Sequence, residues 1–266
     1  MSVDAGRPLA LVTGASSGIG YELAKQFAGH GFDLIINAED PGIADTASEL
    51  RRPGASVQGV QADLTTHNGV ERLYAAVVDD GRPLQVLAIN AGVGVGGPFA
   101  ETELAADLRL VDLNVRSAVH LAKLCVRDMA ARRQGRVLFT SSIAATQPGP
   151  FEATYAASKA FLLSFSEALR EELKDHGVTV TALMPGPTET EFFERAGLED
   201  TRLGSSKKDD PAQVAEQAYE ALMSGKDHVV AGSPKNKVMA GAAKLMPETA
   251  KAKAHRHLSE PGSGND

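Results

Sequence analysis

The chain has 266 residues, 43% of them hydrophobic and 23% charged, and a formal net charge of −7. This length suits one large domain or two small ones of an ordinary globular protein. The negative charge disfavours broad nucleic-acid binding, and a single cysteine, Cys125, excludes an internal disulfide and a Cys-rich zinc site. No apolar run is long enough to cross a bilayer and residues 1–8 show no secretory signal, so we expect a cytoplasmic protein without stable membrane insertion.

The first predicted unit is a strand, a glycine loop and a helix. Residues 8–13 are a short apolar run bounded by turn residues, which indicates a buried strand. The loop Gly14-Ala-Ser-Ser-Gly18-Ile-Gly20 follows, and a helical pattern continues to residue 28. Glycines let a ligand approach the backbone, and a helix N-terminus offers free N–H groups to phosphate. A tight turn between packed elements is the alternative, but the strand–helix context favours a dinucleotide site.

An acidic residue follows the second predicted strand, over residues 33–37. Glu39 lies 19 residues after Gly20, and an acid at about this distance commonly binds a ribose hydroxyl. A solvated loop charge is the alternative interpretation. A helix over 43–52, a strand over 56–61 and a helix over 70–78 are predicted next.

A strand over 85–90 leads into a segment rich in glycine, residues 92–97, which suits a wall against which a flat ligand lies. A long helix is predicted over 104–132, and strands over 135–140 and 178–184. Strands that alternate with helices of this length predict parallel pairing and right-handed crossovers. We therefore expect one doubly wound α/β domain of Rossmann type, with helices on both faces of the sheet and ligands at the carboxyl ends of the strands.

Tyr155 and Lys159 lie at the start of a helix predicted over residues 154–174. Residues four apart share one helix face, so the phenol and the ammonium can point at one place. A nearby positive charge favours the phenolate and can lower the tyrosine pKa by roughly 1–3 units. The pair is therefore a candidate proton-transfer group, with a half-buried Tyr beside a solvated Lys as the alternative.

Five motifs resemble, in order and spacing, those of the short-chain dehydrogenase/reductase family, of the compact single-domain kind. They are the loop at 13–20; the acidic Asp63; Asn90-Ala91-Gly92; the set Ser142, Tyr155 and Lys159; and Pro185-Gly186 with Thr188 and Thr190. The family's Asn-Asn-Ala-Gly motif reads Ile89-Asn90-Ala91-Gly92 here, so its first Asn is replaced. The resemblance covers about residues 9–232.

The resemblance implies an oxidoreductase that transfers hydride between a nicotinamide cofactor and a carbonyl or secondary alcohol. Tyr155 would be the general acid and base, and Lys159 would lower its pKa and hold the nicotinamide ribose. Ser142 would stabilise charge on the substrate oxygen. Asn114 would hold a water that connects Lys159 to solvent, with a helix-packing role as the alternative. No metal is needed, and no cluster of metal ligands is evident.

The cofactor would be bound at the ends of the strands by Gly14, Ser16, Ser17, Gly18, Ile19, Gly20, Glu39, Asp63, Leu64, Asn90, Ala91, Gly92, Tyr155, Lys159, Pro185, Gly186, Thr188 and Thr190. NAD(H) is weakly favoured over NADP(H), because Glu39 would repel a ribose 2′-phosphate. Ala38 stands where NAD-preferring relatives usually have Asp, and the loop lacks the basic residue typical of NADP-preferring ones.

The substrate is expected to be a hydrophobic or medium-sized carbonyl compound or alcohol. Residues 188–206 would form a mobile lid, and the predicted substrate wall is Val93, Gly94, Ser142, Ala144, Phe151, Tyr155, Phe192 and Phe193. Phe192 and Phe193 could instead only anchor the lid to the core.

The C-terminal residues read as a separate segment after a main domain over 1–233. Residues 234–266 are basic, with an apolar helical stretch at 238–246 and a tail, 259–266, that we expect to be disordered. We expect this segment to cap the body of the protein or to pack on a neighbouring subunit, in preference to lying on a membrane surface. By family resemblance the helices over 104–132 and 154–174 would pair, giving a homodimer or homotetramer.

Two other functions stay open. A non-catalytic dinucleotide sensor could use the same fold, although the complete set of catalytic residue types speaks against it. An epimerase-type enzyme could use the same Tyr–Lys pair, but such enzymes carry a larger C-terminal substrate region than the roughly 80 residues after Pro185.

Overall fold

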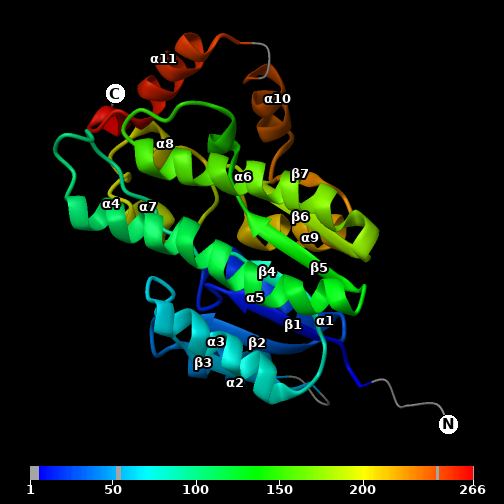
Figure 1. Cartoon of the computed structure of the whole chain (residues 1–266). Coiled ribbons are helices and arrows are strands. Elements are labelled where there is room, and N and C mark those ends of the chain that lie inside the picture. Colours follow the sequence, from blue (N-terminus) through cyan, green and yellow to red (C-terminus); the bar gives the residue numbers. More distant parts are fainter. Residues whose placement is uncertain (1–5, 52–54, 244–245, 266) are drawn as a thin grey trace.

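The computed structural model describes residues 6–51, 55–243 and 246–265. At its centre is a parallel sheet with the strand order β3-β2-β1-β4-β5-β6-β7 (Figure 1). The strands are β1 (Leu9–Thr13), β2 (Asp33–Ala38), β3 (Val57–Gln61), β4 (Leu84–Ile89), β5 (Gly135–Thr140), β6 (Val178–Pro185) and β7 (His228–Ala231). The doubly wound α/β fold is confirmed, and the structure adds β7, a four-residue edge strand too short for a clear alternation pattern.

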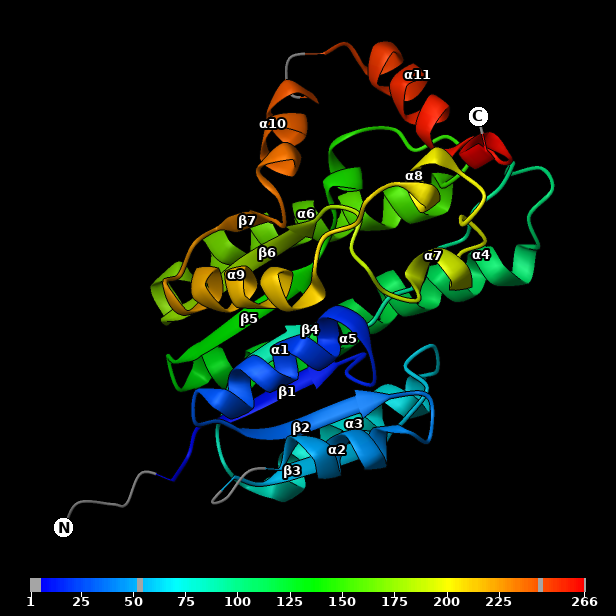
Figure 2. The same cartoon turned by 180° about the vertical axis from the view of Figure 1, so that it is seen from behind.

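Helices cover both faces of the sheet, as Figures 1 and 2 show from opposite sides. One face carries α1 (Gly18–Gly29), α2 (Ile43–Leu50) and α9 (Pro211–Met223). The other carries α3 (His67–Asp80), α5 (Ala118–Ala131) and α6 (Ala153–Leu173). Strands β1, β2, β4, β5 and β6 are therefore buried almost throughout, which is why they read as mainly apolar runs, whereas the edge strands β3 and β7 have exposed residues.

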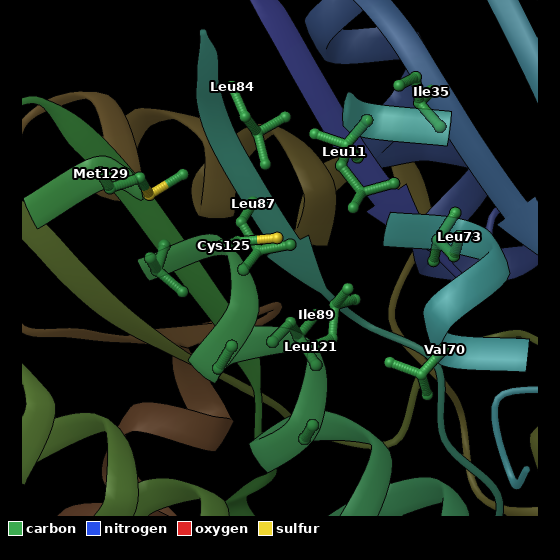
Figure 3. Packing of buried hydrophobic residues seen from close by; sticks show 14 of the residues in the cluster. Leu11, Ile35, Val70, Leu73, Leu84, Leu87, Ile89, Leu121, Cys125 and Met129 are labelled. Atoms are coloured by element: carbon green, nitrogen blue, oxygen red, sulfur yellow. The ribbon is translucent and has the colours of Figure 1, made fainter. Parts of the chain in front are cut away.

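β1 shows how one strand serves both cores. Leu9 and Leu11 pack in the α3–α5–α6 core, whereas Ala10 and Val12 pack in the α1–α2–α9 core, as the alternation of side chains along a strand requires. Figure 3 shows the first core, with Leu11 and Leu87 of the sheet near Cys125 of α5. Burial raises the pKa of the Cys125 thiol to about 12, so it is an inert core residue.

The long predicted helix over 104–132 consists of three segments. α4 (Leu104–Val111) continues without a break into a π-helix (Asp112–Ser117), which continues into α5. A π-helix is rare and commonly marks a functional site. It carries Asn114, whose position is described below.

Two segments lie above the carboxyl ends of the strands. The predicted lid contains two short helices, α7 (Phe192–Arg195) and α8 (Arg202–Ser205). The C-terminal segment forms α10 (Pro234–Ala243), α11 (Glu248–Ser259) and a 3₁₀ turn (Ser263–Asn265), with α11 next to α8 (Figure 2). No helix in the described part of the chain is both long and apolar enough to span a membrane.

The expectation of a disordered tail from residue 259 is wrong for residues 259–265. Ser259 is fully buried, and Ser263 is 6% exposed. The composition is polar, which is typical of disorder, but these polar groups bond to other parts of the chain instead of to water. The helix predicted at 238–246 begins earlier, at Pro234, and is described as far as Ala243, because residues 244 and 245 of the prediction lie outside the described residues.

Candidate active site

The glycine loop after β1 brings backbone close to backbone. A side chain at Gly20 would place its Cβ 1.9 Å from the carbonyl oxygen of Gly14, and Gly14 and Gly18 have φ angles of 64° and 57°. Only glycine, which has no Cβ, accepts the close approach at Gly20 and the positive φ angles at Gly14 and Gly18 without strain. Ser17 precedes α1 and makes no side-chain capping bond, so amides of the first turn are left for an external acceptor such as a phosphate. The tight turn that the motif suggests is therefore present, and its role as a ligand cradle stays a prediction.

A cleft of about 330 Å³ opens at the carboxyl ends of the central strands. Its walls include the loop after β1, the ends of β4, β5 and β6, the lid and the C-terminal segment. From the predicted cofactor set, the cleft is lined by Gly14, Ser16, Ser17, Gly18, Ile19, Gly20, Asn90, Ala91, Gly92, Tyr155, Lys159, Pro185, Gly186, Thr188 and Thr190. The strand order reverses between β1 and β4, so the cleft lies at the topological switch point, where such sheets bind ligands.

Tyr155 and Ser142 both line the cleft and lie within hydrogen-bonding reach of each other. Ser142 follows β5 in an extended conformation, and its Oγ accepts a hydrogen bond from the Ala144 amide at 3.1 Å. Its hydroxyl proton therefore remains available to a group in the cleft. Burial raises the pKa of Tyr155 far above its ordinary value, the charge of Glu152 raises it further, and a hydrogen bond with Ser142 opposes both.

Lys159 lies one helical turn after Tyr155 and is 4% exposed. Its Nζ donates to the carbonyl oxygen of Thr140 at 2.9 Å and lies 5.6 Å from the centre of the Tyr155 ring. Burial lowers the pKa of Lys159 to about 8. In this geometry the factors that set the Tyr155 pKa are burial, Glu152 and Ser142, so the expected lowering by Lys159 is not seen.

Asn114 is 1% exposed, and both polar atoms of its side-chain amide are hydrogen-bonded. Its Oδ1 accepts from the Val93 amide at 2.9 Å, and its Nδ2 donates to the Val93 carbonyl at 2.9 Å and to Ser158 Oγ at 3.0 Å. Asn114 does not line the cleft, but a Cβ on Gly92 would approach both Asn114 Oδ1 and Lys159 Nζ, at 3.1 and 3.2 Å. The π-helix thus places Asn114 where it clamps the loop after β4 beside Lys159.

The lid closes over the glycine-rich loop. A Cβ on Gly94 would lie 2.6 Å from the Phe192 ring, and one on Gly96 would lie 2.4 Å from Leu198. These two glycines make room for lid side chains, which corrects the expectation that a flat ligand lies against the whole segment. The Phe192 ring is 5.0 Å from the Tyr155 ring, centre to centre, so the lid reaches the face of α6 that carries Tyr155.

Three predicted cofactor residues lie outside the cleft: Glu39, Asp63 and Leu64. Glu39 is exposed and forms an ion pair with Arg109 at 2.5 Å, and Arg109 also lies 3.5 Å from an Asp63 oxygen. Burial alone would raise the pKa of Asp63, but hydrogen bonds from Thr65 and the nearby Arg109 hold it below its usual value. Sequence reasoning missed Arg109, because it lies on α4, 70 residues from Glu39.

The predicted substrate residues Val93, Gly94, Ala144, Phe192 and Phe193 line the cleft with Ser142 and Tyr155.

Phe151, also predicted to contact the substrate, does not line the cleft. Its φ angle is 66°, in the left-handed region, and the Arg256 guanidinium of α11 lies 5.3 Å from the centre of its ring. That unusual backbone conformation directs the side chain to α11, which no local sequence pattern predicts.

One group of possible metal ligands lies elsewhere among the described residues. His67 and Glu71 of α3 and His120 of α5 place donor atoms within 4.8 Å of one another. The sequence alone showed no such cluster, because His120 is far away in the chain. None of the three lines the cleft, and Glu71 Oε1 and His120 Nε2 bond directly at 2.7 Å.

The comparisons with known proteins settle the family. The family model described as short chain dehydrogenase matches residues 8–200. The chain belongs to the short-chain dehydrogenase family. It is therefore an oxidoreductase, and the resemblance drawn from its motifs is confirmed.

Named relatives and solved structures are similar to this chain over most of their own length. A ketoacyl reductase, HetN, from Nostoc is 27% identical over 241 residues, which is 89% of this chain and 82% of the relative. A short-chain dehydrogenase from Sphingobium yanoikuyae, solved with NADPH, has a TM-score of 0.79 at 28% identity and covers 89% of this chain and 93% of its own. A 3-ketoacyl-(acyl-carrier-protein) reductase from Brucella melitensis, solved with NADH, has a TM-score of 0.74 at 25% identity, covering 84% and 96%.

Proposed function

We propose that this short-chain dehydrogenase uses a nicotinamide cofactor to interconvert a carbonyl compound and a secondary alcohol, and that it works chiefly as a reductase of ketones. The observation that carries the proposal is the cleft itself, which brings Ser142, Tyr155 and Lys159 together beside a glycine loop shaped for a diphosphate. Relatives crystallised with NADPH and NADH support the choice of cofactor.

Tyr155 and Ser142 would both act on the carbonyl oxygen of the substrate. When bound, the nicotinamide would supply or accept the hydride. Tyr155, whose pKa is raised by burial, stays protonated at neutral pH and gives its proton to the carbonyl oxygen of the substrate. Ser142 donates a second hydrogen bond to the same oxygen.

Lys159 is held in place by the Thr140 carbonyl, which takes one of its three protons. The remaining two can bond to hydroxyl groups of the cofactor. Asn114 holds the adjoining loop through both atoms of its amide. The same phenol would give its proton in reduction and take one back in oxidation, and the relatives named ketoacyl reductases support reduction as the main direction.

The wall around this group is mostly apolar: Ile143, Ala144, Phe192, Phe193, Leu203 and Leu258 line the cleft. Such a wall suits a ketone with aliphatic or aromatic substituents, and relatives named ketoacyl reductases point the same way. The test is a panel of methyl ketones and of aromatic ketones with NADH and NADPH. Oxidation of the cofactor that depends on the ketone is expected, and a sensor that only binds the cofactor would show none.

A cytoplasmic location remains part of the proposal.

We expect NAD(H) to be preferred, and Glu39→Arg to reverse the preference. Glu39 follows β2 and adds negative charge where a 2′-phosphate would be bound, although Arg109 partly offsets it. The substitution replaces repulsion by attraction, and like charges at such a site cost on the order of 1–4 kcal/mol. The ratio of the Kd values for NADPH and NADH, measured by fluorescence titration, should fall at least roughly tenfold. Tighter binding of NADPH than of NADH by the wild type would contradict the proposal.

We also expect a homodimer or homotetramer. Leu104, Leu108 and Phe161 are 71%, 54% and 39% exposed on α4 and α6, and α4 contacts α6, so they form an apolar surface without cover in the single chain. Light scattering at micromolar concentration should give at least twice the mass of one chain. Leu108→Glu should shift the mass toward the monomer, whereas Val238→Glu, at a 70% exposed residue of α10, serves as the control. A wild-type monomer would contradict this prediction.

A further inference from the structure

The C-terminal strap, defined as residues 248–265 and comprising α11 and the 3₁₀ turn after it, lies across the cleft. It follows the part of the chain that the family model matches, which ends at residue 200. The strap contacts the chain on two sides. One is the loop that leads into the catalytic helix α6, and the other is the lid at α8 (Figure 2).

A buried polar cluster fixes the strap to the catalytic helix. Glu152, His255 and Ser259 are 3%, 4% and 0% exposed. Glu152 Oε2 lies 3.0 Å from His255 Nε2 and accepts from Ser259 Oγ at 2.9 Å, and Gln147 Nε2 lies 3.0 Å from His255 Nδ1. The buried Lys251 adds a contact to the Thr146 carbonyl at 3.4 Å. Glu152 comes three residues before Tyr155, so this contact fixes the first turn of the helix that carries the catalytic group.

The opposite end of the strap is bonded to the lid. The amide of Gly264 donates to the Asp200 carbonyl at 2.7 Å, and the amide of Gly262 donates to the Asp200 carboxylate at 3.0 Å. In return, the amide of Arg202 donates to Ser263 Oγ at 3.1 Å. Since both ends are bonded, the strap connects the lid with α6 and bridges two walls of the cleft.

Two strap residues, His255 and Leu258, line the cleft. Both ring nitrogens of His255 are already engaged, by Gln147 on one side and by Glu152 and Ser259 on the other. His255 therefore presents ring carbons to the cleft instead of a free donor or acceptor, and Leu258 presents an aliphatic side chain. A surface of this kind takes an apolar group.

We propose that the C-terminal strap is a substrate-recognition element: Leu258 and His255 hold the apolar substituent of the ketone that lies farthest from Tyr155, and Glu152 with Ser259 positions His255. This inference rests on the proposed function and adds to it the residues that select the substrate. His255 and Ser259 are positioning and specificity residues and take no part in proton transfer.

The first experiment varies the size of the wall. Leu258→Ala and Leu258→Phe are compared with the wild type on methyl ketones from 2-butanone to 2-decanone. The ratio of kcat/KM for the longest to the shortest ketone should rise roughly tenfold with Ala, because the smaller side chain leaves room for one or two more methylenes of the substrate. The same ratio should fall with Phe, because the larger side chain takes up that room. An unchanged ratio in both variants would overturn the proposal.

The second experiment follows the strap without turnover. Hydrogen exchange of the amides of residues 248–259 should accelerate in His255→Ala and Ser259→Ala and remain as in the wild type in the control Lys253→Ala, on the exposed face of α11. Glu152→Gln, which keeps an acceptor oxygen, should hold the strap, whereas Glu152→Ala should release it. Addition of 2-decanone should slow exchange in the wild type more than 2-butanone does.

The two proposals fail in different ways. A wild type whose strap is protected by 2-decanone but which reduces no ketone refutes the proposed function alone. Turnover of the panel with no protection of the strap, or with the same exchange in His255→Ala as in Lys253→Ala, refutes the role of the strap alone. If the wild type neither binds nor reduces any ketone, both are refuted.

Discussion

Tyr155→Phe is expected to abolish turnover while leaving cofactor binding within a few-fold of the wild type. The substitution removes one hydroxyl and keeps the ring that packs against Phe192, so the walls of the cleft remain. A positioned general acid contributes about 10²–10⁴-fold, and kcat should fall by this factor. Single-turnover measurements with saturating cofactor give the chemical step directly.

Tyr74→Phe is the matched control. Tyr74 on α3 also loses a hydroxyl, one that donates to Asp128 at 3.1 Å, at a place that does not line the cleft. Its kcat should equal that of the wild type. If Tyr155→Phe retained more than about a tenth of kcat, another group would have to deliver the proton.

Lys159→Met is expected to combine loss of activity with a gain in stability. The folded protein without cofactor holds Lys159 at a pKa of about 8, against an ordinary value of 10.5 for a lysine in water. Between these pH values the unfolded chain binds more protons, so stability rises with pH across this window. Below about pH 8 both states carry the charge, and the full cost of burying it applies.

Replacing Lys159 by Met removes the free-energy cost of burying the lysine charge. At pH 7 the free energy of unfolding of Lys159→Met without cofactor should exceed that of the wild type by about 1–3 kcal/mol, and the difference should shrink as the pH rises toward 10.5. Urea unfolding at pH 7 and pH 10 measures it, and kcat should fall at least about 10²-fold. Lys123→Met, at an exposed residue of α5, should change neither. A variant less stable than the wild type at pH 7 would show that the bond to Thr140 outweighs the cost of burial.

The parts of the fold and site that could be predicted share a local signature. β1 reads as an apolar run because it is buried on both faces, and the loop before α1 is marked by glycines that no other residue could replace. Tyr155 and Lys159 are four apart on a helix, so their proximity follows from helix geometry alone. In each case the residues that determine the structure lie within a few positions of one another.

The parts that could not be predicted depend on contacts between distant segments. His255 and Ser259 reach Glu152 across 103 and 107 positions, and their polar composition resembles that of a disordered tail. Arg109 meets Glu39 only because α4 passes the end of β2. The pKa of Tyr155 could not be read from its spacing to Lys159 either, since burial and Glu152 determine it.

The π-helix at Asp112–Ser117 also bears on how this chain should be aligned and engineered. A π turn contains one residue more than an α turn, and each residue of an α-helix rotates the chain by about 100°. The wide turn absorbs the extra residue, so removing one residue here would restore a regular α-helix with α4 and α5 keeping their mutual orientation, whereas a deletion elsewhere in these helices would rotate one against the other by that angle. Leu104 and Leu108 would keep their outward face, and the residue displaced would be Asn114, which lies in this turn and is bonded to Val93. A one-residue gap in an alignment at this point is therefore not equivalent to a gap in a loop, and chimaeras of this chain should be joined outside residues 104–131.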